Sequence, residues 1–393
     1  MDKFDCVIIG GGMVGAASAL SLAQLGLKVA IVEKVVPNAF KPEQPFDLRV
    51  SAISLSSQHL LEQLDAWQQI KQWRMCPYRR LGVWELEASY TEFTSDDIDQ
   101  PHLGHIIENR LIQLSLWQQI NEHGNIHIFC PESLLDFQQT STQVTVQLSS
   151  QTLTAKLLIA ADGANSQVRK LANIGSTGWD YQQSAMLINV ETALSQQDIT
   201  WQHFRSTGPV AMLPMPDASE LGGSASLVWY HEKEEIARLS QLSHEQLQTL
   251  VMEAFPKKLG EIKVIDKASF PLTRRHANYY QKGRVLLLGD AAHTINPLAG
   301  QGVNLGFKDV KALQVVIAKA IGEGQCWHDV EILSSYEKVR RNDNLLMMSA
   351  MDMLYSGFNH PSLLIKLVRN SGLFLTNKLP HLKNKALAYA CGI

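Results

Sequence analysis

The sequence predicts an α/β fold in which a parallel sheet is combined with an inserted mixed sheet and a helical C-terminal region. Three observations support this. An apolar strand, a glycine-rich turn and a helix open the chain, similar apolar strands follow far downstream, and the segment between them alternates aromatic and polar residues. Continuous apolar runs are typical of strands buried on both faces of a parallel sheet, whereas alternation is typical of strands covered on one face.

The elements can be justified in order along the chain. Residues 4–9 are an apolar run rich in Val and Ile, 14–25 have a helical pattern, and 28–32 form a second apolar run. This strand–helix–strand order over about 30 residues predicts a βαβ unit. Two later apolar runs, at 156–161 and 284–288, are predicted to be further central strands.

The remaining elements belong to the middle and the end of the chain. Residues 225–231 combine aromatic and polar side chains, which favours a mixed or antiparallel sheet inserted into the first fold. The segment 36–45 contains three prolines and is predicted to be a loop. Helices are predicted at 303–321 and over most of 329–393.

Composition excludes several classes of protein. The chain has 393 residues and a formal net charge of -3, so we expect a globular protein without general affinity for nucleic acid. Its five cysteines are dispersed and form no C-x-x-C pair, which favours a reducing compartment and predicts no metal site. We see no signal peptide and no apolar run of about 18 residues, so the expected location is the cytoplasm.

The glycines after the first strand indicate a dinucleotide site. Gly10, Gly12 and Gly15 form a G-x-G-x-x-G pattern between a strand and a helix, and Glu33 ends the second strand. The first glycine permits the turn, the second lets a pyrophosphate approach the backbone, and the third lets helix and strand pack closely. The acid would bind a ribose hydroxyl pair, which predicts a Rossmann-like site but does not distinguish NAD from FAD.

Two further motifs place an acid beside a glycine after an apolar strand. Asp162–Gly163 follows one strand, and Gly289–Asp290 follows another and continues into the turn Gly300–Gly302. An acid at the carboxyl end of a parallel strand is well placed to hold a ligand hydroxyl. A Gly-Gln-Gly turn that opens a helix offers N–H groups to an anionic or electron-rich edge.

These three ordered motifs resemble the flavoprotein aromatic hydroxylases typified by para-hydroxybenzoate hydroxylase, over nearly the whole chain. Five segments resemble more specifically the ubiquinone-biosynthesis hydroxylases: Asp47–Ser54, Pro77–Leu81, Glu108–Arg110, Phe270–Ala277 and Gly289–Gly306. The resemblance implies an FAD-binding, para-hydroxybenzoate hydroxylase-like fold. It implies a discontinuous FAD-binding domain formed by residues 1–72, 101–175 and 276–330. It also implies an inserted mixed-sheet substrate domain formed by 73–100 and 176–275, and a helical C-terminal region at 331–393.

The resemblance also implies roles for individual residues. The turn and helix start would take the FAD pyrophosphate, Glu33 the adenosine ribose, and Asp290 the ribityl chain. The remaining implied FAD contacts are Gly10, Gly12, Met13, Val14, Gly15, Arg49, Arg110, Asp162, Gly302, Val303 and Asn304. The loop Pro297, Leu298, Ala299 and Gly300 would lie near the reacting carbon, and no catalytic base can be named.

Several of these residues have a plainer interpretation. Arg49 and Arg110 could be surface ion pairs, which contribute little energy. His293 is expected to pack or cap a turn rather than act in catalysis, because a histidine without a placed partner is weak evidence.

The middle sheet and the paired arginines also leave alternatives open. Four apolar residues of that sheet are candidate pocket walls, although ordinary core packing is the alternative for each: Met212, Pro214, Trp229 and Phe270. Arg274 and Arg275 could meet the NADPH phosphate or be solvated.

The C-terminal segment combines positive charge with apolar residues. No acidic residue follows Asp352, and five basic residues alternate with Leu, Ile, Phe and Val: Lys366, Arg369, Lys378, Lys383 and Lys385. A basic amphipathic helix is attracted to an anionic membrane surface, so peripheral contact with the inner membrane is expected. The alternative is a helix packed on the domain with a solvated basic face.

The implied activity is hydroxylation of a polyprenylated benzoquinol ring in ubiquinone biosynthesis, with 2-octaprenyl-3-methyl-6-methoxy-1,4-benzoquinol as the expected substrate. The reaction would use NAD(P)H as a transient co-substrate and O2, through a flavin hydroperoxide, and other ubiquinone-biosynthesis proteins are expected partners. Hydroxylation at another ring position, a different FAD oxidoreductase such as a prenyl reductase, and a non-catalytic FAD-binding scaffold remain alternatives.

Overall fold

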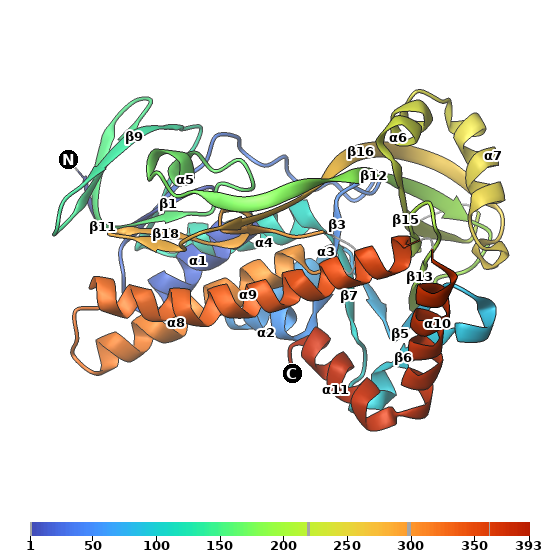
Figure 1. Cartoon of the computed structure of the whole chain (residues 1–393). Helices are drawn as coiled ribbons and strands as arrows, with labels where there is room; N and C mark the ends of the chain where they lie inside the picture. The colour runs from blue at the N-terminus through green and yellow to red at the C-terminus, as the bar shows by residue number, and fades with distance from the viewer. Residues whose placement is uncertain (1, 218–220, 297–299, 361) are drawn as a thin grey trace.

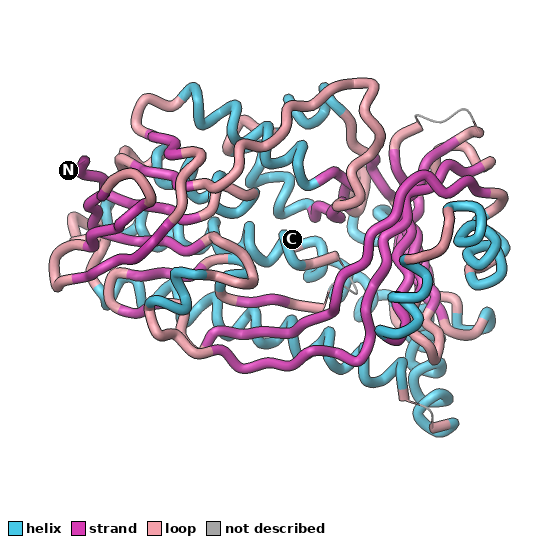
Figure 2. Tube along the Cα trace, turned by 90° about the horizontal axis from the view of Figure 1, so that it is seen from above, coloured by secondary structure: helices cyan, strands magenta, loops and turns pink. Residues whose placement is uncertain are grey.

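The computed structural model describes residues 2–217, 221–296, 300–360 and 362–393. Two β-sheet bodies lie at opposite ends of the molecule and are joined by a pair of long strands, with helices along one side (Figure 1; Figure 2). The predicted α/β class, with a largely parallel sheet and a second mixed sheet, is confirmed.

The first sheet is built around the N-terminal strand. Its central order is β17-β18-β11-β1-β2-β8, and β9 and β10 form an antiparallel arm beside β11. Ile9 pairs with Ala160 and Val32, and Ala160 pairs with Leu287, so the segments that follow these four strands begin at one edge of the sheet. The strand bounds are β1 Asp2–Ile9, β2 Val29–Val32, β8 Ile126–Phe129, β9 Leu134–Gln139, β10 Val144–Leu148, β11 Thr152–Ala160, β17 Gln281–Lys282 and β18 Val285–Leu287.

The second sheet is mostly antiparallel, with the order β19-β16-β12-β15-β14-β13-β5-β6. Its longest strands, β12 and β16, run between the two bodies (Figure 1). β5 pairs in parallel with β13, which brings residues near 80 into a sheet otherwise formed after residue 175. The bounds are β5 Arg80–Trp84, β6 Thr91–Thr94, β12 Ser176–Thr192, β13 Ile199–His203, β14 Val210–Met215, β15 Gly223–Glu232, β16 Ile262–Ala277 and β19 His293–Thr294.

A small third sheet, which the sequence did not indicate, lies between these bodies. It has the order β3-β7-β4, with bounds Val50–Ser54, Gly104–Glu108 and Cys76–Tyr78. The helices are α1 Met13–Ala23, α2 Leu55–Gln63, α3 Trp67–Trp73, α4 Asn109–Glu122, α5 Gln167–Leu171, α6 Lys233–Ser240, α7 His244–Ala254, α8 Gly302–Gly322, α9 Val330–Asn359, α10 Leu363–Lys378 and α11 Pro380–Cys391.

The hydrophobic core explains how the motifs are held. All four residues of β2 are buried, as expected for a parallel strand covered on both faces. α1 packs against α4 and α8, so the helix that follows the glycine turn lies beside the helix that follows the Gly-Gln-Gly turn. The second sheet has its own core, covered by α6 and α7.

The three C-terminal helices confirm the predicted helical tail, but their charges lie differently from the expected outward basic face. Arg369 forms an ion pair with Glu85, and Lys383 forms one with Asp97. These two basic side chains therefore face the body of the protein. Within the part of the chain that the structure covers, we find no helix long and apolar enough to cross a membrane.

Candidate functional site

The turn after β1 has the shape that its three glycines predict. Gly10 has a φ of +102°, and a Cβ there would lie 2.3 Å from the carbonyl oxygen of Ala161. A Cβ on Gly15 would lie 1.9 Å from the carbonyl oxygen of Gly10, so α1 approaches the strand only because the side chain is absent. Gly12 differs, because a Cβ there would meet no atom within 4 Å. Its bare side faces open space that a ligand could occupy.

The start of α1 can attract an anion and also joins the motifs. Gly12 is the N-cap and provides no side-chain cap, so the first N–H groups of the helix lack a helical acceptor and form its positive end. Val14 Cγ2 lies 3.2 Å from the position of a Cβ on Gly289 and 2.6 Å from one on Gly306. The glycine turn, the Gly-Asp motif and α8 are therefore in contact, and Met13 begins the helix beside them.

Gly11, in the middle of the turn, is held from two sides. Its N–H donates to Glu33 Oε2 at 2.6 Å, and its carbonyl oxygen accepts from Gln113 Nε2 at 2.8 Å and Trp117 Nε1 at 2.7 Å, both on α4. Sequence reasoning missed Gln113 and Trp117, since neither belongs to a motif. The contact fixes the turn and the acid at the end of β2 as one unit.

Asp162 joins the end of β11 to the next helix and keeps one oxygen free. Its Oδ2 accepts from the backbone N–H groups of Gln167 and Val168 at 2.7 and 3.1 Å. Its Oδ1 is buried and has no hydrogen-bond partner. An unsatisfied buried carboxylate oxygen is costly, so this atom calls for a donor from a ligand or water.

The Gly-Asp motif presents an exposed acid above a buried network. Asp290 is exposed, and within the described residues its side chain makes no hydrogen bond. Enough protein surrounds it that loss of hydration raises its pKa, and the charge of nearby Arg49 opposes that rise. Asp290 is thus available to a ligand hydroxyl group, with Arg49 close by.

Below this acid, Asp309 on α8 is the centre of the buried network. Its Oδ2 lies 2.5 Å from His293 Nε2 and accepts from the N–H of Gly289 at 2.9 Å, while its Oδ1 accepts from Arg340 Nε at 2.7 Å. Burial by itself raises the pKa of Asp309, but His293 and Arg340 lower it to about 2. His293 is therefore buried beside the turn, as the plainer interpretation expects, but it has a placed partner in Asp309 that the sequence did not indicate.

At the start of α8, the Asn304 side chain is hydrogen-bonded inside the protein, whereas the first backbone N–H groups have no side-chain cap. Asn304 Oδ1 accepts from Ser57 Oγ at 2.7 Å and from the N–H of Ser54 at 3.1 Å, so its amide is committed to the β3–α2 junction. The N-cap of α8 makes no side-chain cap, which leaves the N–H groups of Gly302, Val303 and Asn304 at the positive end of the helix.

The loop before α8 carries the residues expected near the reacting carbon. Pro297, Leu298 and Ala299 lie outside the described residues. Gly300 has a φ of +61°, and a Cβ there would lie 3.3 Å from that of Ala52 on β3, which favours glycine at this position.

The two predicted arginines behave differently. Arg49 is exposed, and its side chain makes no hydrogen bond within the described residues. Arg110 donates to both carboxylate oxygens of Asp47 at 2.9 Å and to the carbonyl oxygens of Asn38 and Ala39. Arg110 therefore ties the 36–47 loop to α4, while Arg49 remains available to an anionic ligand.

The candidate pocket walls divide between the two faces of the second sheet. Met212 and Trp229 belong to the core under α6 and α7, and Pro214 follows Met212 at the same parity along β14. These three residues match the alternative of ordinary core packing, because successive side chains of a strand point to opposite faces and theirs is the face under α6 and α7. Phe270 belongs to the other cluster, which includes Ile295 before the loop and Leu305 on α8.

The residues of β14 and β15 that alternate with these face α8 and α9 instead. Ala211, Leu213 and Val228 pack in the same cluster as Phe270 and Leu305. This apolar face is the surface of the second sheet that α8 and α9 approach, so it is the better candidate for a substrate wall.

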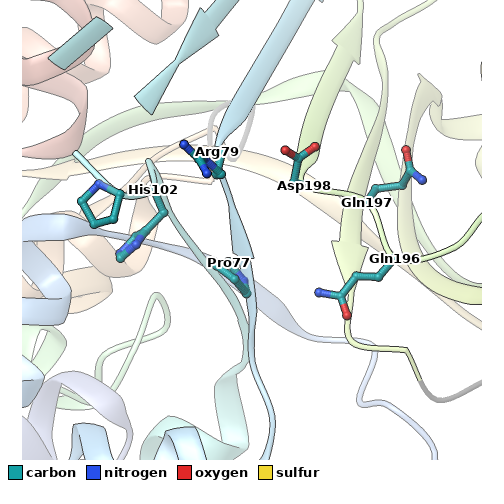
Figure 3. A pocket seen from close by; sticks show the side chains of 7 residues that line it. Pro77, Arg79, His102, Gln196, Gln197 and Asp198 are labelled. Carbon is teal, nitrogen blue, oxygen red and sulfur yellow. The ribbon is translucent and has the colours of Figure 1, made fainter. Parts of the chain in front are cut away.

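Two other features lie apart from these motifs. A pocket of about 420 Å³ lies between the β4–β5 connection and the segment before β13, where Gln196, Gln197 and Asp198 face Pro77 and Arg79 (Figure 3). None of its lining residues belongs to the three motifs, so it is not the dinucleotide site.

The second feature is a group of potential metal ligands in the α8–α9 connection. Cys326, His328 and Asp329 hold their ligand atoms within 4.8 Å of one another. The guanidinium of Arg284 lies 3.0 Å from His328 Nδ1, and a positive charge there disfavours a cation.

The residues at the edge of the first sheet fit FAD. The open side of Gly12 and the two uncapped helix ends suit a pyrophosphate and an electron-rich ring edge. The free Asp162 Oδ1 and the exposed Asp290 can each accept from a hydroxyl group. Glu33 stands at the end of β2, where an acid reaches a ribose.

Comparison with known proteins adds independent findings. The FAD binding domain family matches residues 3–348. The chain is 41% identical over 390 residues to the 3-demethoxyubiquinol 3-hydroxylase of Escherichia coli, covering 99% of this chain and 98% of the relative. It is 32% identical to a mitochondrial ubiquinone biosynthesis monooxygenase of Xenopus tropicalis, covering 98% of this chain and 93% of that protein. The crystal structure of the p-nitrophenol 4-monooxygenase PnpA of Pseudomonas putida matches with a TM-score of 0.80 at 18% identity, over 98% of this chain and 97% of that one.

Proposed function

Because this chain belongs to the FAD-binding-domain family of flavoprotein monooxygenases, as a full-length relative of ubiquinone-biosynthesis hydroxylases, we propose that it hydroxylates the ring of a polyprenylated benzoquinol. The specific substrate we propose is 2-octaprenyl-3-methyl-6-methoxy-1,4-benzoquinol. The observation that carries this choice is the 41% identity, over almost the full length of both chains, to a protein named 3-demethoxyubiquinol 3-hydroxylase. Proteins that supply and consume the same ring are the expected partners.

The residues that would hold FAD follow from the geometry of the sheet edge. Gly10, Gly12 and Gly15 shape the turn, and the first N–H groups of α1 would bind the pyrophosphate. Glu33 would accept from the adenosine ribose, and Asp290 from the ribityl chain.

Three further contacts complete the proposed FAD site. The uncapped N–H groups at the start of α8 would face the pyrimidine edge of the flavin ring, where a partial positive charge favours electron density. Asp162 would use its free oxygen, and Arg49 would approach a phosphate near Asp290. Arg110 acts one step away, since it holds the 36–47 loop through Asp47.

FAD bound at this site would supply the redox chemistry of a reaction in which NAD(P)H provides two electrons, one oxygen atom of O2 enters the substrate and the other leaves as water. The protein must place the ring beside the flavin and keep water out. The apolar face formed by Ala211, Leu213, Val228 and Phe270 can do both, because it packs toward Leu305 in the first turn of α8. The flavin ring and the quinol ring would therefore meet between the second sheet and α8.

Lipid analysis of a strain lacking this gene tests the proposal. The proposed function predicts accumulation of demethoxyubiquinone, restoration of ubiquinone by the wild-type gene, and no restoration by Asp290→Ala. Accumulation of an earlier polyprenylphenol would move the reaction to another ring position. Normal ubiquinone, in a strain without a redundant enzyme, would refute the assigned pathway.

Oxygen uptake by the purified protein separates hydroxylation from reduction. A hydroxylase consumes NAD(P)H and O2 in equal amounts and forms hydroxylated quinol. A prenyl reductase would consume NAD(P)H without O2, and a non-catalytic scaffold would bind FAD without turnover.

A further inference from the structure

Helix α10 presents its polar residues to the protein and its apolar residues to solvent. Arg369 Nε donates to Glu85 Oε2 at 2.7 Å, and Asn370 Nδ2 donates to the same oxygen at 2.6 Å. Asn370 Oδ1 accepts from Ser89 Oγ at 2.6 Å, and Asn377 Nδ2 donates to the carbonyl oxygen of Tyr90 at 2.9 Å. The inner side of the helix is thus a hydrogen-bonded polar surface, the reverse of an ordinary surface helix.

The outer side of α10 is apolar. Five large side chains on it are exposed by half or more, and we call them the α10 apolar face: Leu367 65%, Val368 65%, Phe374 50%, Leu375 52% and Leu379 51%. At about 100° per residue the four within the helix fall within an arc of about 120° on one side, and Leu379 follows as the C-cap. α10 lies at one end of the molecule, beside β5 and β6 (Figure 1).

The inner contacts hold the helix in this orientation. The side chains of Glu85 and Arg369 are only 7% and 10% exposed. Burial raises the pKa of Glu85, but the hydrogen bonds from Arg369 and Asn370 outweigh burial and lower it. Turning the apolar face inward would break this pair and leave a buried charge unpaired, which is strongly unfavourable.

The unpaired charges that the C-terminal helices themselves contribute beside the α10 apolar face are positive. No acidic residue follows Asp352 in the sequence, although the whole chain has a net charge of -3. Lys378 lies within the apolar arc, and its ammonium group lies 5.8 Å from the ring of Phe374. Lys385 on α11 is also exposed. An apolar patch with lysines beside it complements the headgroup region of an anionic bilayer.

We propose that the α10 apolar face docks this protein on an anionic lipid bilayer. Leu367, Val368, Phe374, Leu375 and Leu379 enter the boundary between headgroups and acyl chains, and Lys378 extends its ammonium to the lipid phosphates. Apolar contact supplies most of the binding, because Arg369 and Lys383 are paired inside the protein. Binding through apolar contact differs from electrostatic attraction of a basic helix face, because vesicle binding should then depend only weakly on salt concentration.

Vesicle flotation with the full-length, FAD-loaded protein tests the proposal. The wild type should float with phosphatidylethanolamine–phosphatidylglycerol vesicles. Salt at about 0.5 M, which screens charges strongly, should weaken binding only a few fold. Leu367→Ser combined with Leu375→Ser should weaken vesicle binding at least about tenfold, since each serine removes exposed apolar area. Lys378→Ala should matter only at low salt.

A matched control removes two equally exposed apolar side chains elsewhere. Val315 on α8 and Val339 on α9 are each 59% exposed, so Val315→Ser with Val339→Ser should bind vesicles like the wild type. All variants change exposed positions, so they should fold, and measuring their thermal midpoints checks this.

Three results would overturn the proposal. The first is a wild type that does not float, and the second is a Leu367→Ser/Leu375→Ser variant that floats equally well. The third is a wild type that forms a dimer whether or not vesicles are present, when the double substitution converts that dimer to a monomer. The last result would assign the face to a second copy of the chain. The assay contains no quinol, so failure here leaves the proposed hydroxylation untouched, and success does not depend on it.

Discussion

Exchanging Gly12 for alanine is expected to weaken FAD binding without destabilising the apoprotein. Gly12 has φ -69° and ψ -173°, an extended conformation that alanine adopts easily, and its Cβ would meet no protein atom within 4 Å. Losing glycine's freedom in the unfolded chain stabilises by ~0.4–1 kcal/mol, and a poorer N-cap costs a similar amount. The two effects nearly cancel, so the free energy of unfolding should change by less than about 0.5 kcal/mol.

The same methyl group occupies the space that the pyrophosphate would need. If the ligand contacts the bare backbone of Gly12, the alanine side chain must displace it or the helix. We expect the dissociation constant for FAD to rise at least about tenfold, which corresponds to about 1.4 kcal/mol.

Gly15→Ala is the matched comparison. Its Cβ would lie 1.9 Å from the carbonyl oxygen of Gly10, a backbone atom that cannot move without shifting β1 or α1. Overpacking of this kind costs ~1–3 kcal/mol or more. This variant should therefore lose stability as an apoprotein, in contrast to Gly12→Ala.

Urea unfolding of both apoproteins and titration with FAD, followed by flavin fluorescence, measure the two effects separately. Wild-type FAD affinity in a stable Gly12→Ala protein would refute a pyrophosphate at this turn. An equally stable Gly15→Ala protein would refute the close packing of α1 against β1.

Three further predictions concern residues outside the glycine turn. If Arg110 acts on FAD only by holding the 36–47 loop, then Arg110→Ala and the double variant Arg110→Ala/Asp47→Ala should weaken FAD binding to the same degree, and Asp47→Ala should weaken it no more than they do. Additive losses in FAD titration would instead indicate direct contact. Asp309→Ala removes the buried carboxylate that pairs with both His293 and Arg340, leaves Asp343 as the remaining acidic partner of Arg340, and should reduce the free energy of unfolding by ~3–5 kcal/mol. Urea denaturation showing a loss below ~1 kcal/mol would contradict the network. Burial, with the charges of neighbouring groups, lowers the pKa of His105 to about 3, so the unfolded chain binds a proton below its own pKa of about 6.5 while the folded chain does not. The free energy of unfolding should therefore be unaffected by His105 above about pH 6.5 and should fall by up to about 2.7 kcal/mol on acidification to pH 4.5. In urea titrations at several pH values, His105→Gln should flatten that dependence.

The location of the candidate site could be predicted from the sequence. Gly10, Asp162 and Asp290 each follow an apolar strand, and the carboxyl ends of parallel strands share one edge, so any such motifs are brought together. Local spacing also predicted α1 and α8 to within a few residues, because capping and periodicity are properties of neighbouring residues.

The contacts that complete the site could not be predicted in this way. Trp117 and Gln113 reach Gly11 across about a hundred residues, and Asp309 joins Gly289 to Arg340. Such pairs depend on how helices are placed against the sheet, and no local pattern encodes that placement.

Orientation was likewise decided by the tertiary structure. Apolar character identified Met212 and Trp229 as possible pocket walls, yet a shift of one residue along a strand exchanges the two faces, so packing under α6 and α7 determined which face they join. Composition marked the segment after Asp352 as basic and apolar, but only the buried Glu85–Arg369 pair shows which side of α10 faces solvent. The sequence alone thus determined the elements, the order of the motifs and the sheet edge where they meet. The fold decided which faces and side chains meet there, because register and helix rotation are set by contacts between residues far apart in the chain.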